Sequence, residues 1–140
     1  MFDLLHMEDL LLTSLIGQLK KMFFTDAEIE KCTARKGDLL VCEGGDFGRA
    51  AIWNFDRPIC IQNHIHRLRA FAPVSTEFFY YLFLFYKSVG LIGGKGIGIQ
   101  GLSSNALHAL VFPLSPLAEQ NRIVEMIKRL MPNCTALYFK

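Results

Sequence analysis

Two β-type segments joined by a glycine-rich turn occupy the middle of the chain, and they constrain its fold more than any other feature. An apolar strand is expected over 39–43, a tight turn over 44–46 and a returning strand over 49–54. A further turn at 56–58 leads into the segment 59–71, which predicts one long strand. Its Gln, Asn, His and Arg residues replace the Val, Ile and aromatic side chains that buried strands prefer. The sequence therefore predicts a sheet whose last strand contacts something polar and anionic.

An uninterrupted strand over 59–71 would place alternate side chains on opposite faces of the sheet. One face would carry Cys60, Gln62, His64, His66 and Leu68, and the other Ile61, Asn63, Ile65, Arg67 and Arg69. Contact with nucleic acid is one interpretation, because Asn and Gln pair with adenine, Arg with guanine, and Arg or His with phosphate. A purely structural polar strand is a second. A metal site made of Cys60, His64 and His66 is a third, although zinc would need a further ligand and the sequence has no second Cys/His cluster.

Helices are expected on both sides of this central region. The first covers 26–32 and begins after Thr25. The second covers 76–89, is capped by Ser75 and is apolar on every side, so most of its surface should be buried.

The last third of the chain begins with a loop over 90–101, which contains six glycines. A short helix capped by Ser103 or Ser104 and a strand over 110–114 are expected next. The pair Ser115-Pro116 then starts a helix that should extend to about residue 131. The mixture of elements predicts an α+β fold.

Charge is distributed unevenly along the chain. Its 140 residues are enough for one domain, 51% of them are hydrophobic, and the formal net charge is +2. Residues 1–56 contain six Lys or Arg and ten Asp or Glu, whereas residues 57–140 contain nine Lys or Arg and three Asp or Glu. A basic second part is typical of a domain that presents one face to a polyanion, although scattered surface charge would give the same numbers.

Several classes of protein are disfavoured by what the sequence lacks. The four cysteines show no CxxC spacing and indicate a reducing compartment, and the acidic start is unlike a signal peptide, so we expect a cytoplasmic protein. The longest apolar run, 78–86, is too short to span a membrane. Gly96, Gly98 and Gly101 match GxGxxG, but a helical segment precedes them where a dinucleotide site needs a strand. No nucleophile elbow, methylation motif or nuclease pattern is present, which predicts a non-catalytic chain.

Five motifs together resemble a known family. They are KGDLLVCEGGDFGRAAIW (36–53), QNHIHRLR (62–69), the helix with paired aromatic residues, GIGIQGLS (96–103) and FPLSPLAEQNRIV (112–124). Their order resembles that of target recognition domains in the DNA specificity (S) subunit of type I restriction-modification systems, over about residues 25–131 and more weakly over 4–12. The resemblance implies a twisted mixed β-sheet recognition domain with a C-terminal spacer helix. It also implies a DNA reader without an active site or cofactor of its own.

The resemblance divides the chain into a recognition domain at 1–115, the start of the spacer helix at 116–131 and a tail at 132–140. We expect the helix to stop where Pro132 interrupts it, so the chain resembles half an S subunit, shortened at both ends. Its implied partners are double-stranded DNA, a methyltransferase subunit that uses S-adenosylmethionine and, indirectly, the restriction subunit, without membrane contact. The alternative is a truncated protein–protein interaction module that binds the methyltransferase subunit without recognising DNA.

Three sets of candidate residues follow. The candidate DNA contacts are Lys36, Arg49, Gln62, Asn63, His64, Arg67 and Lys95. The glycines expected to shape loops so that backbone can approach phosphate are Gly44, Gly45, Gly94 and Gly96. The residues expected to pack on a helix of a second copy or of the methyltransferase subunit are Leu117, Ile123, Ile127 and Leu130.

Overall fold

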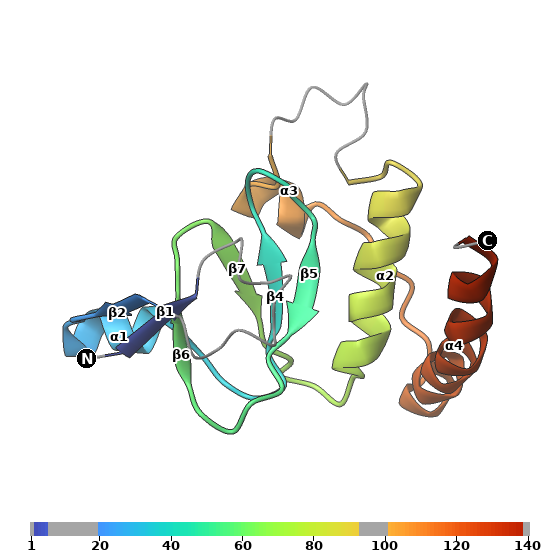
Figure 1. The fold of residues 1–140 in the computed structure, drawn as a ribbon, viewed down its shortest axis with the longest axis horizontal. Coiled ribbons are helices and arrows are strands. Elements are labelled where there is room, and N and C mark those ends of the chain that lie inside the picture. The colour runs from blue at the N-terminus through green and yellow to red at the C-terminus, as the bar shows by residue number, and fades with distance from the viewer. Residues whose placement is uncertain (1, 6–19, 93–100, 139–140) are drawn as a thin grey trace.

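The strands form two small sheets. The computed structural model describes residues 2–5, 20–92 and 101–138 (Figure 1). A four-stranded sheet has the order β2-β1-β6-β3 and contains β1 (Phe2–Leu5), β2 (Lys20–Met22), β3 (Thr33–Ala34) and β6 (Ile59–Ile61). A three-stranded sheet has the order β5-β4-β7 and contains β4 (Leu39–Cys42), β5 (Ala50–Ile52) and β7 (Ile65–Leu68). The first sheet is mixed, because β1 pairs with β6 in parallel, and the second is antiparallel.

The central strand β4 is buried on both of its faces. Leu39 and Val41 belong to a core cluster that includes Phe83, whereas Leu40 and Cys42 belong to a second cluster that includes Trp53. Alternate side chains of a strand point to opposite faces, so an unbroken apolar run is the pattern expected of a strand covered twice.

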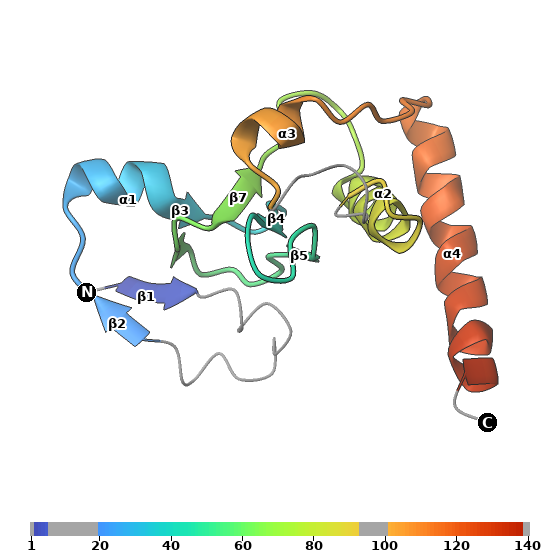
Figure 2. The same ribbon diagram turned by 90° about the horizontal axis from the view of Figure 1, so that it is seen from above.

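Four helices complete the described chain: α1 (Asp26–Cys32), α2 (Thr76–Ser88), α3 (Ser104–His108) and α4 (Leu117–Tyr138). Figure 2 shows α2 between the three-stranded sheet and α4. The predicted helix starts at Thr25, Ser75 and Ser103 are confirmed, since each of these side chains accepts a hydrogen bond from a backbone N–H in the first turn. Within the described ranges, no helix combines the length and the apolar character needed to cross a membrane.

The aromatic helix α2 is less buried than its composition suggested. Phe78 and Phe83 are buried, most of the other aromatic side chains are half-buried, and Phe85 is exposed. The three-stranded sheet and α4 pack against α2 without covering Phe85.

The prediction of one strand over 59–71 is wrong. The segment divides into β6 and β7, which belong to different sheets, with a turn at Asn63-His64 and a hydrogen bond from the N–H of Ile65 to the carbonyl of Gln62 (3.0 Å). Ile61 and Ile65 are both buried in the Trp53 cluster. A turn between them buries both side chains and leaves the polar residues at the surface, where Asn favours turns.

Two further expectations about elements are wrong. The segment 110–114 is not a strand, and Phe112 instead packs its ring against Phe79, Phe83 and Tyr86. This segment is therefore held by the Phe112 ring and by a hydrogen bond from the Tyr86 hydroxyl to the carbonyl of Val111 (2.5 Å), rather than by a ladder of backbone bonds. Helix α4 also does not stop before Pro132 but continues to Tyr138. Proline removes one N–H donor from a helix, and here that loss does not end it.

Candidate nucleic-acid interface

The antiparallel register places the candidate residues at two opposite ends of the three-stranded sheet. At one end, Cys42 pairs with Ile65 and Val41 with Ala50, so the β4–β5 hairpin turn lies beside the turn at 62–64. We call this the hairpin end (upper part of Figure 1). At the other end, Leu39 pairs with both Ile52 and Leu68, which brings the turns at 35–38 and 54–58 together with the end of β7.

The hairpin end presents polar side chains on a turn. Asn63 is exposed, Gln62 is half-buried, and the side chain of His64 is 63% exposed. The N–H of Glu43 donates to the carbonyl of His64 (2.9 Å), and the two side chains approach to 3.7 Å between Nδ1 and Oε2. Gly45 has φ +62°, which favours glycine, whereas Gly44 has open space where a Cβ would lie. Gly94, Lys95 and Gly96 lie outside the described residues.

Arg49 is near the same end but is engaged by the protein. Its side chain is 17% exposed and lies 3.6 Å from a carboxylate oxygen of Asp46. Asp46 also accepts a hydrogen bond from Lys87, whose Nζ donates to the carbonyl of Phe47 (3.0 Å) as well. The hydrogen bond from Lys87, with the charges of Lys87 and Arg49, holds the pKa of Asp46 below its usual value.

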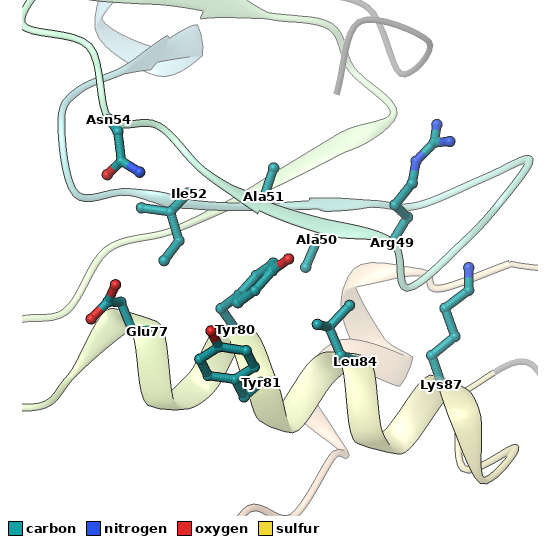
Figure 3. A pocket seen from close by; sticks show the side chains of 10 residues that line it. All are labelled: Arg49, Ala50, Ala51, Ile52, Asn54, Glu77, Tyr80, Tyr81, Leu84 and Lys87. Carbon is teal, nitrogen blue, oxygen red and sulfur yellow. The ribbon is translucent and has the colours of Figure 1, made fainter. Parts of the chain in front are cut away.

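A pocket of about 610 Å³ lies between the edge strand β5 and α2 (Figure 3). Arg49 and Lys87 lie toward one end of the pocket, and Glu77 and Asn54 lie toward the other. Both cations share Asp46, and Glu77 forms an ion pair with Lys128 of α4 (2.8 Å). The charges of this pocket are therefore balanced within the protein, which makes it a poor site for a polyanion.

The basic and imidazole side chains of β7 hold neighbouring backbone groups. His66 Nε2 lies 2.5 Å from the carbonyl oxygen of Leu102, a distance that requires the N–H tautomer at this nitrogen. Nη1 of Arg67 donates to the carbonyl of Thr33 (2.5 Å). These two residues therefore have the structural role that was the alternative interpretation of the polar strand. Contact between Arg67 and DNA stays a prediction.

Arg69 forms a bidentate ion pair with the buried carboxylate of Asp38. Its Nε and Nη2 donate to Oδ1 and Oδ2 at 2.7 and 2.6 Å, and the N–H of Arg35 donates to Oδ2 at 2.7 Å. Burial by itself would raise the pKa of Asp38, but the hydrogen bonds from Arg69 and Arg35 and the charges of Arg69 and Arg67 outweigh it and lower the pKa. Asp38 thereby joins the turn at 35–38 to the end of β7.

The end of the sheet opposite the hairpin carries an excess of positive charge, and we call it the basic end. Its turns are joined by hydrogen bonds from the N–H of Gly37 to the carbonyl of Trp53 and from the Trp53 indole to the carbonyl of Arg57, both 2.8 Å long. The cations of the basic end are Arg35, Lys36, Arg57, Arg67 and Arg69, and all except Arg67 are exposed. Residues 35–38, 54–57 and 67–69 contain only two carboxylates, the buried Asp38 and the exposed Asp56, which pairs with Lys36 (2.6 Å).

The sequence predicted Lys36 and Arg67 as DNA contacts but did not single out Arg35, Arg57 and Arg69, which the structure places at the same end of the sheet. The signal was present, because Arg35 and Arg57 lie beside the turn markers Gly37-Asp38 and Pro58. Alternate turns of an antiparallel sheet lie at the same end, which would have brought the two arginines together.

The predicted apolar stripe of α4 is partly buried and partly exposed. Gln120 and Val124 are buried, Ile123 and Ile127 are half-buried, and Leu117 and Leu130 are 39% and 54% exposed. Helix α4 packs on α2, and its two most exposed predicted positions remain open to solvent. Their packing on another helix stays a prediction.

Among the described residues, no group of three or more His, Cys, Asp or Glu side chains is placed to hold a metal ion. Cys60 is buried on β6 and lies beside Cys32, whereas His64 is exposed in the turn. Burial and the neighbouring Cys60 thiol raise the pKa of Cys32 to about 12.

The family model that describes the type I restriction modification DNA specificity domain matches residues 24–138. The chain belongs to this family. The predicted family and the predicted α+β class with a mixed sheet and a C-terminal helix are thus confirmed.

Solved structures of similar proteins agree with this assignment. A chain from a study of complex assembly and conformational transition of the type I R-M system has a TM-score of 0.61 and 25% sequence identity, over 76% of this chain and 26% of that one. The HsdS subunit from Thermoanaerobacter tengcongensis has the same TM-score with 24% identity, over 76% of this chain and 25% of that one, and supports the fold. The specificity domain described here thus spans about a quarter of either protein. None of the curated proteins matches it.

Proposed function

We propose that this specificity domain contacts DNA as a non-catalytic component of a type I restriction-modification system and directs the methyltransferase and restriction subunits to their target. The basic end is the single observation that carries the proposal. Exposed Arg and Lys side chains on two adjoining turns match the charge of a phosphate backbone. No cofactor is assigned to this chain, since S-adenosylmethionine would be used by the methyltransferase subunit.

The two ends of the sheet suit different parts of a duplex. The guanidinium and ammonium groups of the basic end suit phosphates, which position a protein without reading sequence. The exposed Asn63 and His64 at the hairpin end offer donors and acceptors that can contact base edges in a groove. Phosphate contacts would then contribute affinity, and the turn at 62–64 would contribute part of the specificity.

The proposal is tested by measuring binding of fluorescent duplexes by anisotropy over a range of salt concentrations. The wild-type chain should bind with a logarithmic affinity that falls linearly with the logarithm of salt. The double variant R35A/K36A should reduce the slope of this line by about 1.8, since each lost phosphate contact contributes about 0.9. Asp56, the partner of Lys36, is 91% exposed, and Arg35 bonds the buried Asp38 through its backbone N–H, which the substitution keeps.

A matched control removes the same amount of charge elsewhere. The double variant K31A/R129A deletes two exposed cations on α1 and α4 and should keep the wild-type slope. Equal slopes for all three proteins would refute the role of the basic end. Binding that does not depend on salt would refute the proposal that the chain contacts DNA.

A second surface supports contact with a partner subunit. Met126, Leu130 and Met131 are 45%, 54% and 47% exposed on the same helix, α4. We propose that they contact the methyltransferase subunit, and gel filtration of the mixed proteins tests this. L130E should abolish co-elution, whereas N121E, which changes an exposed polar position of α4, should preserve it. Co-elution without DNA binding by the wild-type chain would favour the module that binds only protein.

A further inference from the structure

A second pocket, of about 400 Å³, opens beside the basic end, where β7 meets α2 and α3. We call it the β7 pocket. Its apolar lining comes from Leu39, Leu68, Val74 and Phe79. Arg67, Arg69 and His108 also line it, and its lining contains no Asp or Glu. This distinguishes it from the pocket beside β5, where Glu77 contributes a carboxylate.

One wall of the β7 pocket is the unpaired edge of a strand. In the described part of the chain, β4 is the only strand paired with β7. The N–H of Glu43 donates to the carbonyl of His64, so the backbone groups of His64, His66 and Leu68 face β4. By the same alternation, the N–H and C=O of Arg67 point away from β4 and offer one donor and one acceptor at the open edge.

Phe71 lies in the bend that follows β7 and also lines the pocket. Its relative exposure is 102%, the largest among the large apolar side chains of the described residues, so its ring gains nothing from the core. A solvent-exposed ring beside a cationic surface is the arrangement that stacks on the bases of nucleic acids.

We propose that the β7 pocket takes a single nucleobase displaced from the duplex stack, with its face on the Phe71 ring and its polar edge on the backbone N–H and C=O of Arg67. The positive charge beside the pocket favours a nucleotide as the ligand, because Arg35, Lys36 and Arg69 lie at the same end of the sheet and attract the phosphates on either side of the base. The inference rests on the proposed DNA contact and names a subsite within it.

Displacing a base costs free energy, and the cost is smallest when the base has no partner. The chain should therefore bind a duplex with one unpaired base more tightly than the fully paired duplex. Replacing an aromatic side chain that stacks on a base with alanine weakens binding by about 1–3 kcal/mol, which is about 5- to 150-fold in affinity.

The test compares wild type, F71A and F23A on both duplexes by anisotropy at several salt concentrations. F71A should lose about 5- to 150-fold in affinity for the unpaired-base duplex and keep the wild-type salt slope. Phe23 is 81% exposed on the segment between β2 and α1, and F23A should bind like wild type. Equal urea midpoints for all three proteins are expected, because neither ring is buried.

The outcomes separate this inference from the proposed function. Salt-dependent binding that F71A leaves unchanged, or equal wild-type affinity for the two duplexes, would overturn the base pocket and leave the surface to a protein partner. Absence of salt-dependent binding by the wild-type chain would overturn the DNA contact itself.

Discussion

Replacing Arg69 with alanine should destabilise the fold through the carboxylate that it leaves behind. The side chain of Asp38 is 3% exposed, and the substitution removes both hydrogen bonds from the guanidinium, leaving the N–H of Arg35. Removing one partner of a buried ion pair typically costs about 3–5 kcal/mol. The Arg69 side chain is 43% exposed, so water can replace part of the interaction, and we expect about 2–3 kcal/mol.

Urea unfolding at neutral pH measures this effect. With a slope of about 2 kcal/mol per molar for a domain of this size, the midpoint of R69A should lie about 1–1.5 M below that of wild type. The variant D38N is the matched control, because its side chain carries no charge. In the D38N background, R69A should lower the free energy of unfolding by less than about 1 kcal/mol. The difference between the effects of R69A in the wild-type and D38N backgrounds is the coupling free energy of Asp38 and Arg69.

The pH dependence has a definite sign. The pKa of Asp38 is lowered in the folded protein, so its contribution to stability is present above the unfolded pKa of about 3.9 and is lost as pH falls through the folded pKa. The difference in unfolding free energy between wild type and R69A should therefore be largest near pH 7 and should shrink below about pH 4. A midpoint shift below about 0.3 M at pH 7, or a difference that does not change with pH, would refute the reasoning.

Two further substitutions test other buried contacts by the same urea assay. G48A should lower the free energy of unfolding by about 2–3 kcal/mol, because Gly48 has φ +77° and an added Cβ would lie 2.5 Å from the buried Ile92 side chain. Its control, G44A, adds a Cβ in open space and should lower this free energy by less than about 0.5 kcal/mol. Q120L should lower the free energy of unfolding by about 2–3 kcal/mol, because the buried Gln120 side chain bonds the N–H of Ser75 and the carbonyl of Ser115. Its control, N121A, changes an exposed side chain and should leave this free energy nearly unchanged. Wild-type midpoints for G48A or Q120L would contradict these assignments.

Local signals predicted the helix starts and the β4–β5 hairpin, but not the short strands β1, β2 and β3. The helix caps at Thr25, Ser75 and Ser103 are decided within four residues of chain, because a side-chain oxygen there bonds the N–H groups of the first turn. The run 39–42 is apolar at every position, and this pattern depends only on the strand being covered on both faces. The order of the five motifs was sufficient to predict the family, which the match over 24–138 confirms.

The candidate site was predicted less completely, because its residues are brought together by strand pairing. Alternation over 59–71 assigned the side chains to two faces of one strand, but an unbroken strand would bury Asn63 between Ile61 and Ile65, and the turn keeps Asn63 exposed. Strand β7 then runs from this turn to the opposite end of the three-stranded sheet, so Asn63 and His64 lie at the hairpin end and Arg69 lies at the basic end.

The sequence by itself determined the helix starts, the apolar central strand, the family and the basic composition of the second part of the chain. Only the tertiary structure decided that Arg69 lies at the same end of the sheet as Arg35 and Arg57, that Asp38 pairs with Arg69 from the turn before β4, and that Phe71 lies beside a strand edge with no partner among the described strands. Periodicity describes each segment relative to its own axis. Contacts between segments far apart in the chain depend on register and on competition for the core, which no local pattern records.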